Sequence, residues 1–120
     1  MPAISFKPEF RDKILDSSKI QTIRQRRKNP IKEGDILLLY INQRSKGNEF
    51  LGKAICKSVG EIKIDWQGIS IKGYFCNKEH AQWIAKLDGF KNLSDMQDWF
   101  AKVYKKLPFE GQYIRWELIQ

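Results

Sequence analysis

Lys19 and Thr22 are the residues of this chain whose types and spacing could support covalent chemistry. A threonine hydroxyl attacks an amide only if a base takes its proton. A lysine can be that base only if burial or a nearby cation lowers its pKa from about 10.4 toward 7–8. Side chains three residues apart point to opposite faces of a strand, whereas in a turn they can converge. Convergence is therefore the structural test, and the alternative is an ordinary strand threonine beside a solvated lysine.

The segment that begins at Lys19 is also strongly basic. Between residues 19 and 32 it has no acidic residue and six basic ones, namely Lys19, Arg24, Arg26, Arg27, Lys28 and Lys32. With the net charge of +8, this segment predicts RNA or a nucleotide-derived ligand as the partner, because several aligned cations neutralise phosphates. The alternative is that the charge serves solubility alone.

Within this segment, Arg24 and Arg26 are two residues apart and would share one face of an extended strand. Arg27, Lys28 and Lys32 would follow in a loop that can track a nucleic-acid backbone. We expect Arg26 and Arg27 to contact phosphate.

Two tyrosines are candidates for stacking on nucleic-acid bases. Tyr40 and Tyr113 both fall in predicted strands, and an aromatic ring at such a position can hold a base by its flat face. The alternative is that both rings pack within the sheet or at its rim.

The cysteines and the histidine lack the spacing of a metal site. Cys56 and Cys76 do not form a CxxC pair, and His80 has no neighbouring ligands at suitable intervals. We expect no metal, no cofactor and a buried, unreactive Cys56. The N-terminus has no apolar signal core, and the longest apolar run, 36–41, is too short to span a bilayer. We therefore expect a cytoplasmic protein without membrane insertion.

The elements that must position these residues are predicted from hydrophobic periodicity. A short strand around residues 4–6 precedes a helix that Pro8 opens, that ends near Ser17, and whose buried face holds Phe10, Ile14 and Leu15. Residues 36–41 form a strand buried on both faces, because all six are apolar, and residues 42–49 form a polar loop.

The second half of the chain changes from strands to helices. Residues 50–59 alternate as a strand in which Gly52 marks a bend or bulge, and residues 62–71 form a hairpin that turns at Gln67-Gly68. Helical periodicity follows in 77–87 and 94–106, the second opening with the capping-box spacing of Ser94 and Gln97.

Residues 113–119 read as a closing strand, with Ile114, Trp116 and Leu118 on its apolar face and Tyr113, Arg115 and Glu117 on the other. About five strands, with helices before and late among them, predict one α+β domain built on a small curved sheet or barrel.

Several motifs, taken in order, resemble those of the ASCH domain family. They are an aromatic start and a helix before Lys19-x-x-Thr22-x-Arg24, the turn Lys32-Glu33-Gly34-Asp35, the sequence Asp88-Gly89-Phe90, and the closing strand Tyr113-Ile114-Arg115-Trp116-Glu117. The resemblance covers nearly the whole chain. It implies a single PUA-like domain over residues 1–120, a β-barrel of about five to six strands with flanking helices. It also implies a cleft lined by the basic segment, and members are generally regarded as RNA-binding or nucleotide-directed proteins.

One bacterial branch of this family hydrolyses the amide of N4-acetylcytidine with a lysine, a threonine three residues later and a carboxylate. Lys19 and Thr22 match the first two, and Asp88 is the nearest equivalent of a residue that is normally glutamate. The resemblance thus implies Thr22 as nucleophile, Lys19 as base and Asp88 as an orienting or acid group. A third reading is a metal-independent ribonuclease in which Lys19 stabilises a phosphorane. The family usually has glycine where this chain has Ser17, and a positive φ there would cost serine more than glycine.

Overall fold

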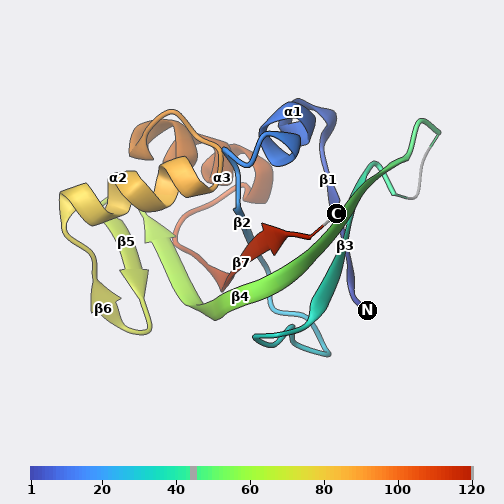
Figure 1. The fold of residues 1–120 in the computed structure, drawn as a ribbon. Helices are drawn as coiled ribbons and strands as arrows, with labels where there is room; N and C mark the ends of the chain where they lie inside the picture. The colour runs from blue at the N-terminus through green and yellow to red at the C-terminus, as the bar shows by residue number, and fades with distance from the viewer. Residues whose placement is uncertain (44–45, 120) are drawn as a thin grey trace.

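One long strand, β4, organises the sheet in the computed structural model, which describes residues 1–43 and 46–119. The strands are β1 (Ala3–Phe6), β2 (Gln21–Arg24), β3 (Ile36–Ile41), β4 (Glu49–Asp65), β5 (Gly68–Ile71), β6 (Tyr74–Phe75) and β7 (Phe109–Leu118). One edge of β4 pairs with β3 and then β5, while its other edge pairs with β7 (Figure 1). β1 adds in parallel to β3, β2 antiparallel to β7, and β6 antiparallel to β5.

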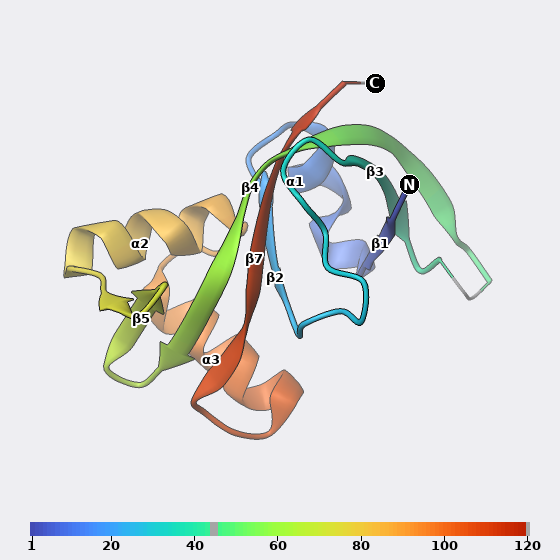
Figure 2. The same cartoon turned by 90° about the horizontal axis from the view of Figure 1, so that it is seen from below.

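The helices lie on two sides of this sheet. A 3-10 turn (Pro8–Phe10) leads into α1 (Arg11–Leu15), and the late helices are α2 (Lys78–Leu87) and α3 (Leu93–Tyr104). Figure 2 shows β4, β7 and β2 running between α2 and α3 on one side and β1, β3 and α1 on the other. Each side has its own apolar core, centred on residues such as Leu39 and Trp116 inside the curved sheet, and Ile84 and Phe100 beneath the late helices. The predicted α+β architecture with flanking helices is confirmed.

The curved sheet has one open side, between β1 and β2. In the described residues β1 pairs only with β3, and β2 pairs only with β7. Two side chains bridge this open side, because Nη2 of Arg24 donates to the Ser5 carbonyl at 2.6 Å and Nη2 of Arg27 donates to the Ala3 carbonyl at 2.9 Å. Two guanidinium groups thus satisfy carbonyls that a neighbouring strand would otherwise bind.

The strand and turn predictions in the middle of the chain differ from the structure in detail. The predicted strand 50–59 and the first arm of the hairpin form one continuous β4, and the expected irregularity at Gly52 is present as a register shift opposite Leu39. The hairpin turns one residue early, at Trp66-Gln67. The cause is Asp65, whose Oδ1 accepts the backbone N–H groups of Gln67 and Gly68. Arg44 and Ser45 of the expected loop 42–49 lie outside the described residues.

β3 is less buried than the sequence predicts, and β7 is more buried. In β3, Leu37, Leu39 and Ile41 are buried but the residues between them are only half-buried, because one face of the strand packs inside the curved sheet. In β7, Tyr113 is buried on the face predicted to be polar, because the late helices cover that side.

Two expectations about the helices are wrong. α3 is capped by Asn92 rather than Ser94, since Oδ1 of Asn92 accepts the Asp95 backbone N–H at 2.8 Å. Leu15, expected in the buried face of the first helix with Phe10 and Ile14, is exposed, while those two residues are buried.

Candidate functional site

Lys19 and Thr22 converge because a turn at Ser17 separates the lysine from the strand. Ser17 has a φ of +63°, the left-handed conformation that glycine adopts more readily than serine. Lys19 therefore lies before β2, which begins at Gln21, and the alternation of strand side chains does not apply to it. Both Lys19 and Thr22 line one cavity together with Asp88.

Lys19 is buried against Asp88 and two aromatic rings. Its Nζ donates to the Asp88 backbone carbonyl at 2.5 Å and lies 3.4 Å from Oδ2 of the same residue. The centroids of the Phe10 and Phe6 rings lie 4.6 Å and 5.7 Å from the ammonium nitrogen. Asp88 is placed there as the C-cap residue of α2.

Burial changes the proton affinities of this pair. Desolvation lowers the pKa of Lys19 to about 8, although the attraction of Asp88 opposes the shift. Desolvation likewise raises the pKa of Asp88 above its usual value, against the effects of Lys19 and Gln21. Both shifts disfavour the charged forms, so desolvation outweighs the attraction between the partners. The lysine is poised to exchange a proton near neutral pH.

Thr22 is paired with a fixed positive charge. Its Oγ1 accepts a hydrogen bond from Nε of Arg24 at 2.9 Å, which leaves the hydroxyl proton to be donated elsewhere. Burial lowers the pKa of Arg24, but an arginine stays protonated in proteins. A cation therefore lies beside the oxygen atom on which negative charge would develop if Thr22 acted as a nucleophile.

The space around these side chains, here the inner cavity, has a volume of about 270 Å³. Six of its fifteen lining residues are aromatic, namely Phe6, Phe10, Phe90, Trp99, Phe100 and Tyr104. The rings of Phe10, Phe90 and Trp99 meet edge to face, which fixes the shape of the wall. Its volume lies near the lower end of the range typical of small-molecule pockets, roughly 300–1,000 Å³.

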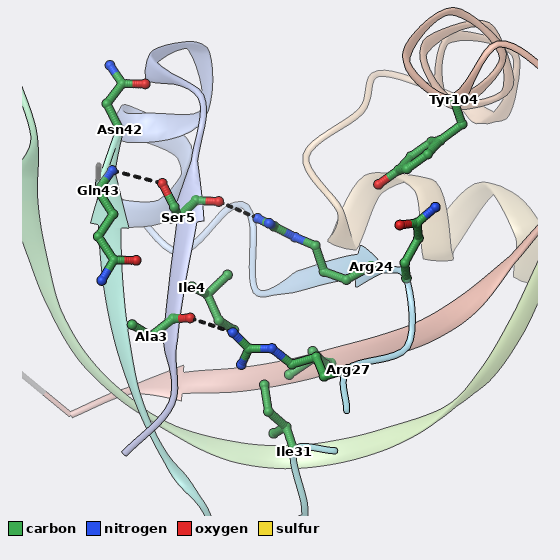
Figure 3. A pocket seen from close by; sticks show the side chains of 11 residues that line it. Ala3, Ile4, Ser5, Arg24, Arg27, Ile31, Asn42, Gln43 and Tyr104 are labelled. Atoms are coloured by element: carbon green, nitrogen blue, oxygen red, sulfur yellow. Dashed lines mark hydrogen bonds between the residues drawn. The ribbon is translucent and has the colours of Figure 1, made fainter. Parts of the chain in front are cut away.

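A second space, here the outer cavity, adjoins the inner one on the open side of the curved sheet. It measures about 600 Å³, shares Ser5, Arg24, Asn42 and Tyr104 with the inner cavity, and has no acidic residue in its lining. Figure 3 shows Arg24 and Arg27 extending toward β1, with Tyr104 reaching from α3 toward Arg24. The small pocket with aromatic walls thus adjoins a larger one lined by Arg24 and Arg27.

The remaining basic residues do not join these cavities. β2 ends at Arg24, so the expected shared face with Arg26 is wrong. Arg26 instead pairs with Glu61 and lines a third cavity of about 510 Å³ that holds two acidic residues as well as lysines. Lys28 and Lys32 are exposed and line none of the three cavities.

The two candidate stacking tyrosines are packing residues. Tyr113 is 5% exposed, and its hydroxyl lies 3.3 Å from Oγ of Ser58. The Tyr40 ring packs on Phe50, with centroids 5.1 Å apart, and lies outside all three cavities. Both rings thus contact other side chains of the protein, and base stacking by Tyr40 and Tyr113 stays a prediction.

Sequence reasoning missed Gln21 and the aromatic wall. Gln21 is fully buried, and its Nε2 lies 3.3 Å from Oδ1 of Asp88 as a donor. Its only sequence signal is its place between Lys19 and Thr22. The helical periodicity of residues 94–106 predicts Trp99 and Tyr104 as core residues, but nothing in it indicates that they also border a cavity.

The described residues contain no group of three or more histidine, cysteine or acidic side chains able to hold a metal ion. Within the same part of the chain, no helix is long and apolar enough to cross a membrane. Cys56 and Cys76 are buried free thiols, and burial raises the pKa of each. Cys56 is thus buried as predicted.

Gly89 fits closely against Lys19. It has a φ of +94°, and a Cβ added there would lie 3.2 Å from Cδ of Lys19. We expect Gly89→Ala to lower the free energy of unfolding in urea by about 2 kcal/mol, because backbone strain of about 1 kcal/mol adds to displacement of the packed lysine. Gly73→Ala is the matched control, since Gly73 has a φ of +85° with nothing within 4 Å of an added Cβ. If both variants lost the same free energy of unfolding, displacing the Lys19 side chain would cost no stability.

Comparisons with known proteins bear on the fold. No protein-family model matches the sequence, and a search of curated proteins gives no match. Among solved structures, the chain is similar to ZmASCH from Zymomonas mobilis, whose crystal structure is that of a serine-to-alanine mutant. The TM-score is 0.58 at 16% sequence identity, and the match covers 98% of this chain and 68% of that one. At this identity the likeness establishes architecture, and it agrees with the order of motifs in the sequence. The chain therefore has the fold of this ASCH structure, a curved sheet with flanking helices.

Proposed function

We propose that this protein binds a nucleoside- or nucleotide-derived ligand, with the base in the inner cavity and the phosphate in the outer cavity. The inner cavity supports this proposal because it combines aromatic walls with Lys19, Thr22 and Asp88. A nucleobase offers the matching chemistry, namely flat apolar faces and a polar edge with donors and acceptors. The positive outer cavity is suited to phosphate because its guanidinium groups can bind two oxygens at once.

Binding can be measured directly with cytidine, cytidine monophosphate and a short single-stranded RNA. Trp99 borders the inner cavity, so tryptophan fluorescence is a suitable signal. We expect all three to bind, with the phosphate-bearing ligands tighter and sensitive to salt and cytidine insensitive to it. Failure of all three at millimolar concentration would contradict the proposal.

Arg27 should account for part of that salt sensitivity. We expect Arg27→Ala to reduce the slope of log affinity against log salt for RNA by about one, because one phosphate contact is lost. The slope for Arg26→Ala should not change, since Arg26 pairs with Glu61 away from the outer cavity. Arg11→Ala controls for total charge, because it removes another surface arginine that pairs with a glutamate. If the slope dropped equally in all three variants, the reduced salt dependence would come from the loss of net charge and not from a lost phosphate contact.

Hydrolysis of an acylated cytidine is the second candidate, favoured by the lowered pKa of Lys19 and by the hydrogen bond from Arg24 to Thr22. In this reaction Thr22 Oγ attacks the amide carbonyl as its proton passes to neutral Lys19. Lys19 then protonates the departing cytidine nitrogen, and water hydrolyses the acyl-threonine ester. Arg24 would stabilise the negative charge that forms on the threonine oxygen as its proton leaves, before that charge passes to the carbonyl oxygen.

Incubation with N4-acetylcytidine tests this candidate separately from binding. We expect release of cytidine and acetate at a rate that rises with pH and reaches half its maximum near 8, because only neutral Lys19 can accept the proton. Labelled RNA in a parallel reaction would reveal cleavage, which the ribonuclease reading requires. Binding of cytidine without any release of acetate would leave the protein a binding module.

A further inference from the structure

Arg115 holds a defined position on β7, on the side of the sheet that faces α2. It is the register partner of Gln21 in β2, and its Nε donates to Oε1 of Gln21 at 2.9 Å. Its guanidinium group lies over two rings, with the centroids of Trp83 and Tyr113 at 5.0 Å and 4.9 Å from Cζ. Contact with two rings restricts the motion of the guanidinium group, which helps to hold the Nε–H bond in its direction.

This bond decides which way the buried amide of Gln21 points. Nε of Arg115 can only donate, so the amide oxygen must face it and the amide nitrogen must face the other way. There the nitrogen lies 3.3 Å from Oδ1 of Asp88 and 3.5 Å from the Ile84 carbonyl oxygen. The reversed amide would set its oxygen against a carboxylate and a donor against Arg115, leaving buried polar atoms unsatisfied.

We propose that Arg115 and Gln21 form a positioning relay that fixes the Asp88 carboxylate, and through it Lys19, from outside the ligand cavities. Neither Arg115 nor Gln21 lines any of the three cavities, so neither reaches a ligand bound there. Gln21 lies on the face of β2 opposite Thr22, because the two are adjacent in the strand. Asp88 thus receives Gln21 at one carboxylate oxygen and Lys19 at the other. The relay concerns the pair itself and holds whether the pair binds or catalyses.

A relay and a direct charge effect predict opposite changes at Lys19. The charged groups that act on Lys19 are Asp88 at the end of α2, Arg24 on β2 and Lys13 on α1. If Arg115 acted directly through space, its loss would remove a cation and raise the pKa of Lys19. If it acts through Gln21, its loss frees the Asp88 carboxylate to move away from Lys19, and the weaker attraction lowers the pKa of Lys19.

The experiment measures the pKa of Lys19 by NMR of protein with labelled lysine side chains. We expect Arg115→Met and Gln21→Met each to lower it by about half a unit or more, as the loss of one hydrogen bond to the carboxylate implies. The double variant should show no larger change than Gln21→Met alone. Arg11→Met, which removes a surface arginine paired with Glu49, should leave the value as it is. A rise, or no change, in Arg115→Met overturns the proposal.

Arg115→Gln separates the hydrogen bond from the charge, because glutamine keeps an N–H donor and loses the positive charge. The relay predicts a smaller fall than in Arg115→Met, whereas a charge effect predicts equal rises in both. Circular dichroism checks that each variant is folded. If Arg115→Met does not fold, Gln21→Met tests the relay in its place. An unchanged pKa of Lys19 in Gln21→Met excludes the relay.

Discussion

Replacing Lys19 with methionine is expected to abolish ligand binding in the inner cavity and to cost the fold about 3 kcal/mol at pH 7. Methionine fills a similar volume between the rings of Phe6 and Phe10, so the loss does not come from a void. It comes from Asp88, which keeps its buried position without the ammonium group that lies 3.4 Å from its carboxylate. An uncompensated buried charge costs more than the pair contributes.

This loss should shrink as the pH falls. Folding raises the pKa of Asp88, so the folded protein favours the protonated carboxyl. The stability from that preference is present at low pH and is lost as the pH rises through the raised pKa. Without Lys19 the preference strengthens, so urea unfolding at pH 5 should show a smaller deficit than at pH 7. Lys19→Met/Asp88→Asn, which removes both charges, should recover most of the stability. If the loss of stability were the same at both pH values, the buried Asp88 carboxylate would not be its cause.

If the protein hydrolyses N4-acetylcytidine with Thr22 as nucleophile, Thr22→Val should slow that reaction about 1,000-fold or more, while cytidine binds within about threefold of its original affinity. Valine keeps the shape of the side chain and removes only the hydroxyl that would attack. Nε of Arg24 also loses its acceptor, a cost of about 1 kcal/mol to stability. The turnover number and the dissociation constant for cytidine, measured separately, distinguish the two roles.

Thr22→Ser is the matched control for this variant, because serine retains a hydroxyl at the same place. We expect it to keep measurable hydrolysis. If Thr22→Val were as active as the original protein, the attacking group would be water, and Thr22 would be an ordinary strand residue.

Much of this fold follows from local patterns. Strand 36–41 is an unbroken apolar run, the two late helices and the closing strand have strong periodicity, and the structure contains each of them. Errors arise where two residues compete for one role. Asn92 and Ser94 can both cap a helix, and the sequence does not show that the chain has already turned at Asn92. At the hairpin, Asp65 determines the turn through two side-chain hydrogen bonds that alternation cannot reveal.

The site is predictable only in part, for a different reason. Lys19 and Thr22 lie close in sequence, and Asp88 follows from the family resemblance, so these three could be named in advance. Gln21 and Arg115 are 94 residues apart, and their pairing depends on the register between β2 and β7. The burial of Tyr113 likewise depends on which helices cover β7, a property of the whole fold.

The hydrogen bonds that Arg24 and Arg27 form across the open side of the sheet compete with the binding of an anion in the outer cavity. The carbonyl oxygens of Ser5 and Ala3 already accept hydrogen bonds from Arg24 and Arg27. An anion that binds the same N–H groups displaces these neutral acceptors, so weakly accepting ions gain little, whereas a phosphate forms stronger, charge-assisted bonds. Such an anion would therefore bind there only if it held the guanidinium groups more strongly than the carbonyls of Ser5 and Ala3 do. When an anion displaces these carbonyls, β1 is held in the described part of the sheet only by its pairing with β3.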